Sequence, residues 1–468
     1  MNPFQAAERR PLRSSPFWKL FVIGFLILLL WIPLTIVRSL ISEREARLSV
    51  VSNEVAATWG YSQTLGGPVL TVPYLMPVRG PKGEINRVRQ MAHFLPESLK
   101  VEGTVAPERR SRGIFETVVY QADLRSSGTF LRPRFEDWDI ASDDILWKEA
   151  FLTIGVSDMR GIRRGTVLHW GGRALPVSPG GGESGIWQTG LRVPVPDLAA
   201  AEPGTVYPFR FDLSIDGSVS LSFLPFGKQT TVALRSSWPD PSFAGAFLPE
   251  SRKVGKDGFQ AVWNVAYFGR SYPQQWRSPD AERLAPVNAL NTSAFGVEMY
   301  LPVDIYQKTE RSVKYGLLFL ILTFLTFFLY EVFSPFALHP VQYLLVGSAL
   351  CLFYLLLLSI SEHVPFGISY AIASAATIAL IGGYSWAILR GAKRALVMSG
   401  VLALLYGYLY VLLQSDDYAL LLGSVGLFLI LALVMYVTRG IDWYGARGGA
   451  APAGPPPAGP PPVTSVEG

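Results

Sequence analysis

The sequence predicts a polytopic α-helical membrane protein with six spans and one large β-rich domain, outside the cytoplasm, inserted between span 1 and span 2. Half of its 468 residues are hydrophobic and only 16% are charged, a composition too apolar for an ordinary soluble protein. Six uncharged runs approach the roughly 20 residues that a helix needs to cross the hydrocarbon core. Between the first two runs the sequence changes to the two-residue alternation of strands.

The first span is an anchor helix over residues 17–37, preceded by a basic segment, 1–16, that carries three arginines. A cleaved signal peptide has a shorter apolar region and a small-residue cleavage site, whereas the charged stretch RSLISEREAR follows this run. We therefore expect an uncleaved anchor. The positive-inside rule then places residues 1–16 in the cytoplasm and the chain from Arg38 onward outside.

Beyond the anchor, an apolar stripe at helical spacing predicts that the helix continues and docks on the following domain. The stripe consists of Leu48, Val51, Val55 and Trp59. Glu43 and Arg47 add an i, i+4 ion pair to the same helix. The helix should end before Gly66, Gly67 and Pro68, which break helical structure.

Residues 38–312 form the predicted domain outside the cytoplasm, with an N-terminal helix followed by many strands. The single cysteine of the chain, Cys351, lies in a later apolar run, so the domain can form no internal disulfide. Its fold must depend on core packing. The glycine-rich stretch Ser178–Gly185 lacks the ending of a phosphate-binding loop and predicts a surface loop or a lobe boundary.

One hairpin is predicted in detail from side-chain register. The runs Phe209–Ile215 and Val219–Phe223 both alternate apolar with polar residues. A two-residue loop would put their apolar sets on opposite faces of the sheet, whereas a three-residue loop, Asp216–Ser218, aligns them. We therefore expect an odd-length loop or a bulge here, with one buried and one solvated face.

Five further spans form a predicted helical bundle over residues 313–438. They cover residues 315–330, 340–361, 364–389, 395–415 and 418–438. Arg390, Lys393 and Arg394 lie in the loop expected on the inside, and the outer loops contain no Lys or Arg. This pattern places both termini in the cytoplasm. Residues 439–468 form a tail whose proline and glycine content predicts disorder.

Ionisable residues at the span ends are the only functional candidates that the sequence offers, because charge near hydrocarbon is costly. They are Glu331, Glu362, His363, Asp417, Arg439 and Asp442. Interfacial anchoring is the alternative reading of each, since side chains at span ends can reach water. No charge lies in the middle of a span, which counts against a proton relay or an ion-coupled carrier.

Local motifs of catalysis are absent from the sequence. The four histidines have no metal-ligand spacing, and no phosphate loop, nucleophile elbow or dinucleotide fingerprint occurs. We expect no catalytic, cofactor-binding or metal-binding residues and hence no enzyme. No basic-aromatic module is present, so nucleic acid is not an expected partner.

Several long segments resemble the CreD family of bacterial inner-membrane proteins. They are WGYSQTLGGPVLTVPY at 59–74, SFAGAFLPESRKVGKDGFQAVWNV at 242–265, FGVEMYLPVDIYQKTERSVKYG at 295–316, HPVQYLLVGSALCLFYLLLLSISEH at 339–363, DYALLLGS at 417–424 and MYVTRGIDWYG at 435–445. The resemblance implies a location in the inner membrane of Gram-negative bacteria and a role in envelope stress responses. It implies no reaction and no catalytic residues.

These observations favour a non-enzymatic protein that supports cell envelope integrity and stress response through its periplasmic domain. Its expected partners are membrane lipid and, in addition, peptidoglycan or another envelope protein. The alternative is a transporter or channel for a lipid or a small envelope component through the bundle. A membrane enzyme acting on envelope polymers is the third hypothesis, and it would need a cleft lined by close carboxylates or a Ser/His pair.

Overall fold

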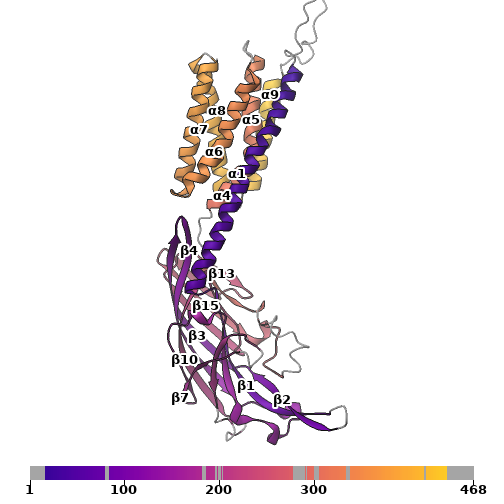
Figure 1. The fold of residues 1–468 in the computed structure, drawn as a ribbon, viewed down its shortest axis with the longest axis vertical. Coiled ribbons are helices and arrows are strands. Elements are labelled where there is room, and N and C mark those ends of the chain that lie inside the picture. Colours follow the sequence, from indigo (N-terminus) through magenta and orange to yellow (C-terminus); the bar gives the residue numbers. More distant parts are fainter. Residues whose placement is uncertain are drawn as a thin grey trace, which may run out of the picture. The chain divides into compact units, whose positions relative to one another are not determined.

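The computed structural model describes residues 16–79, 84–181, 186–195, 198, 202, 204–277, 290, 292–299, 305–333, 338–389, 391–415 and 418–439. The chain forms two compact units. One, the helical unit, comprises Met1–Ser42 and Ile305–Gly468, and the other, the β-rich unit, comprises Glu43–Asp304 (Figure 1). The predicted combination of apolar helices with a large β-rich insertion is confirmed at this level.

The helical unit contains most of the apolar sequence. Its helices are α1 (Pro16–Trp59, which continues into the β-rich unit), α4 (Ile305–Lys314), α5 (Gly316–Phe333), α6 (Pro340–Ser361), α7 (Phe366–Leu389), α8 (Ala392–Gln414) and α9 (Ala419–Thr438). Five helices are long and apolar enough to cross a membrane, and the pair α4 and α5, bent by 41°, makes a sixth if it forms one span. Among the described residues the structure therefore supports five or six spans.

Helix α1 contacts the other helices of its unit through one buried stripe. The stripe has a spacing of three to four residues and consists of Leu26, Leu30, Leu34, Val37 and Ile41. The backbone of α6 approaches α1 closely at Gly347. A Cβ at this position would lie only 2.2 Å from Leu30 Cδ1, so there is no room for a side chain. Gly316 at the start of α5 similarly approaches Leu34. Small residues at helix contacts are the usual way in which membrane helices approach each other.

Two mixed sheets form the β-rich unit. The eight-stranded sheet has the order β14 (Ser251–Gly255), β15 (Gly258–Ala266), β12 (Gln229–Ser236), β3 (Ser98–Arg112), β4 (Phe115–Leu131), β10 (Val206–Ser218), β6 (Val167–Trp170), β7 (Arg173–Pro176). The nine-stranded sheet has the order β13 (Pro241–Gly245), β17 (Phe295–Met299), β11 (Ser220–Phe223), β1 (Gln63–Arg79), β5 (Phe151–Val156), β9 (Gly190–Pro194), β8 (Ser178–Pro179). Strand β2 (Ile85–Phe94) pairs with β1 and with β16 (Gln275–Arg277).

The core of the β-rich unit lies between the inner faces of the two sheets. Strand β10 illustrates this arrangement, because one of its faces is buried and the other is not. Its buried residues are Phe209, Phe211, Leu213 and Ile215, and the residues between them are more exposed. A cavity of about 20 Å³ remains in this core, lined by residues of both sheets, among them Ile154 and Val232. Its size allows little more than one water molecule.

A row of three glycines crosses the nine-stranded sheet. Gly66 of β1 pairs with Gly155 of β5, which pairs with Gly190 of β9. The indole of Trp187 lies against two of these glycines, because a Cβ would fall 2.2 Å from Trp187 Cζ2 on Gly66 and 1.9 Å from Trp187 Cε2 on Gly155. Gly66 and Gly155 thus leave the space that this aromatic ring fills.

The predicted hairpin between residues 209 and 223 is wrong. Strand β10 pairs with β4 and β6, whereas β11 pairs in parallel with β1 and in antiparallel with β17. The chain leaves one sheet for the other at Val219, whose φ of 62° turns it away from the β10 direction. Val219 is 41% exposed and is not on the buried face with Leu221. The predicted burial of the β10 alternation is confirmed.

The helical continuation of α1 to Trp59 is confirmed, and its second half docks within the β-rich unit. Ser52 Oγ lies 2.8 Å from Thr117 Oγ1, and Trp59 Nε1 donates to the Tyr120 carbonyl at 3.3 Å. The predicted pair of Glu43 with Arg47 is present at 3.0 Å. Of the predicted glycine-rich loop, residues 182–185 lie outside the described part of the chain, as does the predicted tail from residue 440 onward.

Candidate functional site

A buried carboxylate, Glu331, forms the centre of the candidate site in the helical unit. It lies near the end of α5, and its side chain is only 7% exposed. An isolated carboxylate in an apolar surrounding costs several kcal/mol, so its hydrogen-bond partners decide whether it is tolerated. The described residues supply three such partners.

Three elements bring these partners to Glu331. Lys19 in the first turns of α1 forms an ion pair with Oε1. The backbone N–H of Leu338, just before α6, donates to Oε1 at 3.0 Å, and Tyr343 Oη on α6 donates to Oε2 at 3.2 Å. The start of α6 is fixed by His339, which caps the helix together with Gln342 and precedes Pro340 in the first turn. We call Lys19, Glu331, Leu338 and Tyr343 the Glu331 cluster.

A second ion pair joins α1 to the helical unit. Arg38 Nη2 lies 3.2 Å from Glu310 Oε1 on α4, and both side chains are partly exposed. Arg38 and Lys19 thus hold α1 to two different helices. Of the four residues in these pairs, the sequence analysis singled out only Glu331 as a candidate. Lys19 was not among the candidates, because no spacing rule connects residues 312 positions apart.

The other sequence candidates do not join this cluster. Glu362 is the C-cap of α6 and His363 follows it, at the opposite end of the helix from the residues that contact Glu331. A 22-residue helix is about 33 Å long, which separates the two ends by a full span. Arg439 caps α9, with its guanidinium 4.2 Å from the ring centroid of Tyr436. Asp417 and Asp442 lie outside the described residues.

Space beside the Glu331 cluster is small. A cavity of about 10 Å³ is lined by Phe327, Leu338, Gln342, Tyr343, Val346 and Ile388. At most one water molecule fits such a volume. No group of three or more His, Cys, Asp or Glu side chains that could hold a metal ion occurs among the described residues. The arrangement therefore suits charge neutralisation between helices better than the binding of a substrate.

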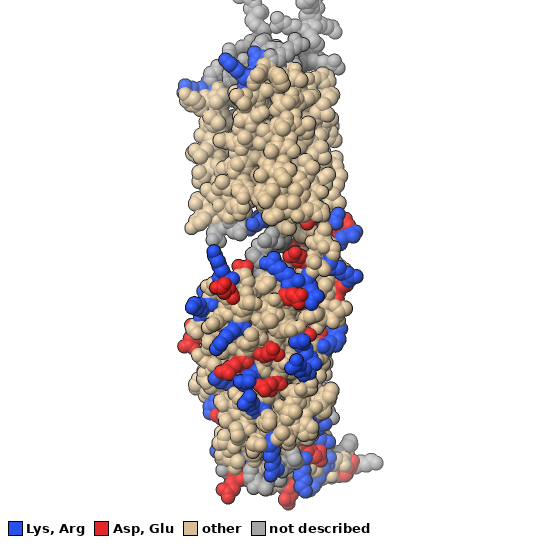
Figure 2. Space-filling view, turned by 90° about the vertical axis from the view of Figure 1, so that its left-hand side faces the viewer, with Lys and Arg blue, Asp and Glu red and all other residues tan. Residues whose placement is uncertain are grey.

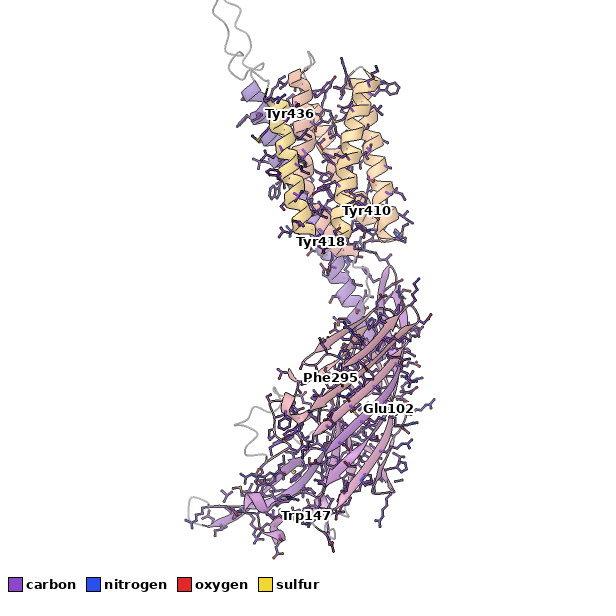
Figure 3. The ribbon with its side chains drawn as sticks, turned by 180° about the vertical axis from the view of Figure 1, so that it is seen from behind. Glu102, Trp147, Phe295, Tyr410, Tyr418 and Tyr436 are labelled. Carbon is purple, nitrogen blue, oxygen red and sulfur yellow. The ribbon has the colours of Figure 1, made fainter. Side chains whose placement is uncertain are left out.

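The β-rich unit offers a larger polar site on the outer face of its eight-stranded sheet. A hollow of about 510 Å³ extends over β12, β3, β4 and β10. Its charged lining residues are Glu102, Asp123, Arg125, Asp212 and Arg235. Lys and Arg are intermixed with Asp and Glu over the face of this unit in Figure 2, and Glu102 is labelled on β3 in Figure 3. We call this surface the outer hollow.

The strand register explains why opposite charges meet in the outer hollow. Glu102 on β3 is directly opposite Arg125 on β4, and Arg125 is directly opposite Asp212 on β10. Arg125 Nε donates to Asp212 Oδ1 at 3.2 Å. Lys100, which hydrogen-bonds to Glu102, lowers the pKa of that carboxyl. Ser214 Oγ donates to Asp123 Oδ1 at 2.5 Å. Each of these three carboxylates thus has a hydrogen-bond donor beside it on the same face of the sheet.

A buried histidine in the β-rich unit was not a sequence candidate. His93 on β2 is 2% exposed, with Nδ1 3.1 Å from Thr71 Oγ1 and its ring beside Trp276. Burial lowers the pKa of His93 to about 3, so the imidazole is neutral at physiological pH. With one hydroxyl neighbour and a large apolar surrounding, it is a core residue.

Together, the apolar helices and the two sheets define a multi-pass membrane protein with one large β-rich domain. The family model for "Inner membrane protein CreD" matches residues 15–444. The inner membrane protein CreD of Escherichia coli (strain K12) is 36% identical over 436 residues, which cover 92% of this chain and 95% of that protein. The chain therefore belongs to the CreD family of inner membrane proteins.

One solved structure aligns with part of the chain but adds no functional argument. A crystal structure of an M1 zinc metallopeptidase mutant from Deinococcus radiodurans, bound to a Tyr-Ser-Ala substrate, aligns with 36% of this chain and 39% of its own. The identity is 11% and the TM-score is 0.19, which is too low to indicate a shared fold. The family membership and the apolar helices together make the chain a multi-pass inner-membrane protein.

Proposed function

We propose that this protein supports cell envelope integrity and envelope stress responses without catalysing a reaction, and that its β-rich domain does so by contacting another envelope component. The observation that carries the proposal is the contrast in available space. The outer hollow offers about 510 Å³ lined by charged side chains, whereas the cavity beside the Glu331 cluster has only about 10 Å³. A binding role therefore fits the β-rich domain.

A periplasmic position for this domain, with both termini in the cytoplasm, is part of the proposal. Its support is the distribution of positive charge. Lys19 at the start of α1, Lys393 and Arg394 at the start of α8, and Arg439 at the end of α9 all lie at helix ends that this topology puts inside. Cysteine labelling at Val254 and at Arg439, in intact cells and in lysed cells, tests it. Labelling of the Arg439→Cys variant in intact cells by an impermeant reagent would contradict it.

The non-enzymatic part of the proposal is supported by how the outer hollow uses its charges. Glu102, Asp123 and Asp212 each have a hydrogen-bonding neighbour of opposite charge or a hydroxyl donor. A general base would instead need a carboxyl aimed at a substrate proton or at a nucleophile. Paired carboxylates of this kind suit recognition of a polar partner.

The decisive experiment uses complementation of a deletion strain under envelope stress. The test variant replaces the hollow carboxylates by isosteric amides, Glu102→Gln, Asp123→Asn and Asp212→Asn. The matched control makes the same kind of change at exposed carboxylates of the same domain, Glu108→Gln and Glu116→Gln. We expect the control to complement and the test variant to fail at equal protein level. Full complementation by the test variant would contradict a role for the hollow.

A transporter or channel for a lipid or a small envelope component is the second candidate. The buried carboxylate of Glu331 favours it, because ionisable groups inside membrane proteins often mark transport paths. Under this hypothesis Glu331→Gln abolishes complementation while the protein remains stably folded. Complementation by a folded Glu331→Gln protein would argue for a purely structural cluster.

A further inference from the structure

Two of the three carboxylates in the outer hollow already have a cationic partner. Glu102 Oε1 lies 2.6 Å from Lys100 Nζ, and Asp212 Oδ1 lies 3.2 Å from Arg125 Nε. Each pair is neutral as a unit, because a carboxylate and a cation of unit charge cancel. A partner of the hollow therefore does not need to neutralise either pair.

The third carboxylate, Asp123, and one guanidinium, Arg235, lack such a partner. Asp123 accepts a hydrogen bond from the Ser214 hydroxyl but forms no ion pair with any described residue. Arg235 lines the hollow and is exposed, and within the described part of the chain it forms neither a hydrogen bond nor an ion pair. Its field reaches Glu102, but the lowered pKa of that carboxyl is due mainly to Lys100. The hollow thus offers one uncompensated negative charge and one uncompensated positive charge.

The register of the eight-stranded sheet puts these two charges on one row across the strands. Thr104 on β3 is paired with Arg235 on β12 and with Asp123 on β4. All three are more exposed than the residues on either side of them along the chain, so their side chains share the outer face of the sheet. Neighbouring strands are about 4.8 Å apart, so about 10 Å separates the backbone positions of the two charged residues.

Short side chains form the floor of the hollow between the two charges. Thr104 lies in the row between Asp123 and Arg235, and Ser214 continues this row on β10, opposite Asp123. Ala233 lies two residues before Arg235 on β12 and therefore faces the same side. These small residues leave a hollow of about 510 Å³, a volume typical of sites for small organic ligands.

We propose that the outer hollow binds a short peptide that carries a free ammonium group and a free carboxylate. The carboxylate of Asp123 and the hydroxyls of Thr104 and Ser214 supply acceptors for the N–H donors of the ammonium group. The guanidinium of Arg235 supplies a planar fork that binds a carboxylate through two hydrogen bonds. This inference names the partner class for the binding role proposed above and rests on that role.

The distance between the two charges limits the length of the ligand. An extended peptide spans about 3.5 Å per residue, so about three residues cover the distance of about 10 Å. A free amino acid carries both charges on one carbon atom and reaches both groups less well. A neutral glycan lacks both charges, and a polyanion would place like charge beside Asp123. A zwitterionic tripeptide satisfies both groups.

Ligand-observed NMR titrations of the full-length protein in nanodiscs, with trialanine as the ligand, test the proposal. We expect trialanine to bind at low salt. N-acetyl-trialanine lacks the ammonium group and trialanine amide lacks the carboxylate, so each should bind about tenfold more weakly. Free alanine, which is too short to span the row, should also bind about tenfold more weakly.

Matched variants assign each charge of the peptide to one residue. Asp123→Asn should weaken the binding of trialanine about tenfold but leave that of N-acetyl-trialanine unchanged, because this ligand has no ammonium group. Arg235→Gln should weaken the binding of trialanine about tenfold but leave that of trialanine amide unchanged. The control variants Asp257→Asn and Arg252→Gln change exposed residues outside the hollow, and their affinities should stay within about twofold of the parent protein.

Three results would overturn the proposal. They are equal affinity of the parent protein for trialanine and its two blocked forms, no binding of trialanine at millimolar concentration, and binding of the neutral trisaccharide chitotriose in place of trialanine. Tryptophan fluorescence of each variant checks that the fold is intact.

The complementation experiment distinguishes failure of this inference from failure of the proposed function. If the variant with all three hollow carboxylates replaced fails to complement and the parent protein binds no trialanine, the hollow has a different polar partner, and only the peptide assignment is overturned. If that variant complements fully, the binding role of the hollow is overturned, and the peptide assignment with it.

Discussion

Two ion pairs of similar chemistry serve different purposes in the two units. Lys19 and Glu331 in the helical unit have side chains that are 28% and 7% exposed, whereas Arg125 and Asp212 in the outer hollow are 59% and 62% exposed. Water can replace either partner of the second pair. It cannot readily reach Glu331, which depends on its protein partners. Burial, not the identity of the paired residues, therefore decides how strongly the fold depends on each pair.

The same contrast extends to the hydrogen-bond partners of each carboxylate. Glu331 receives donors from three separate elements, namely α1, the residue before α6, and α6 itself. Asp212 pairs with Arg125 on the adjacent strand and lies near Arg210 on its own strand. Loss of Glu331 thus leaves groups on several helices without their acceptor, while loss of Asp212 leaves a solvated surface.

The largest expected effect is that of Glu331→Ala. The change leaves a partly buried ammonium, a phenol and a backbone N–H without their shared acceptor, and we expect a loss of about 3 kcal/mol or more in the free energy of unfolding. Unfolding by SDS in mixed micelles measures it. The double variant Lys19→Met/Glu331→Leu should recover most of the loss, because two apolar side chains can replace a buried pair. No recovery would mean that the pair itself specifies the packing of α1.

Gly155→Ala tests whether the core of the β-rich unit is as intolerant as the buried pair. The added Cβ would lie 1.9 Å from Trp187 Cε2, so the indole or the strand must move. We expect a loss of about 2 kcal/mol in the free energy of unfolding, measured by tryptophan fluorescence in urea. Gly165→Ala, where a Cβ meets nothing within 4 Å, is the matched control. A smaller loss for Gly155→Ala in a Trp187→Ala background would confirm the cause.

Acid should weaken the β-rich unit through His93. Its pKa is about 3 in the folded protein and close to 6.5 in an unfolded chain, so the unfolded state binds the proton first as the pH falls. The stability contribution of neutral His93 is complete above pH 6.5 and decreases between pH 6.5 and about 3, by about 2 kcal/mol at pH 5. Urea titrations at pH 7.5 and pH 5 measure the loss. In His93→Gln the difference between the two pH values should shrink by this amount.

The smallest effect is expected for Arg125→Ala. The pair with Asp212 is exposed, so its removal should change the free energy of unfolding by less than about 0.5 kcal/mol. The same urea titration measures it. A loss of unfolding free energy comparable to that of Glu331→Ala would contradict the conclusion that burial decides how strongly the fold depends on each pair. It would also show that the outer hollow is rigidly organised before any partner binds.

The helices were the most predictable part of the molecule. The expected spans 340–361 and 364–389 correspond to α6, Pro340–Ser361, and α7, Phe366–Leu389. Uncharged length and flanking charge determine where such helices begin and end, and both are local properties of the sequence. The continuation of α1 to Trp59 was likewise visible in its apolar spacing.

Strand pairing was less predictable, as the segment around Val219 shows. Alternation correctly identified the buried side chains of β10, but alternation does not specify which strand lies next to it. Asp216-Gly217 resembles a turn sequence, yet both residues are paired with β4, and the chain changes sheets only after them, at Val219. In the Glu331 cluster the sequence marked the carboxylate and missed Lys19, because their contact depends on how α1 and α5 pack, which no local pattern records.

The parallel strand pairs also determine how much of the chain must be synthesised before the two sheets can form. Gln63 pairs with Leu221 and Val101 pairs with Val232, so neither sheet closes until distant downstream sequence has been translated. The ion pair of Lys19 forms later still, because Glu331 follows Lys19 by 312 residues in the chain. Contacts of such long range form slowly. A nascent chain arrested before residue 331 therefore carries both an unpaired lysine in its anchor and an anchor stripe without its partner helices. Cellular chaperones and proteases act on such incompletely folded chains.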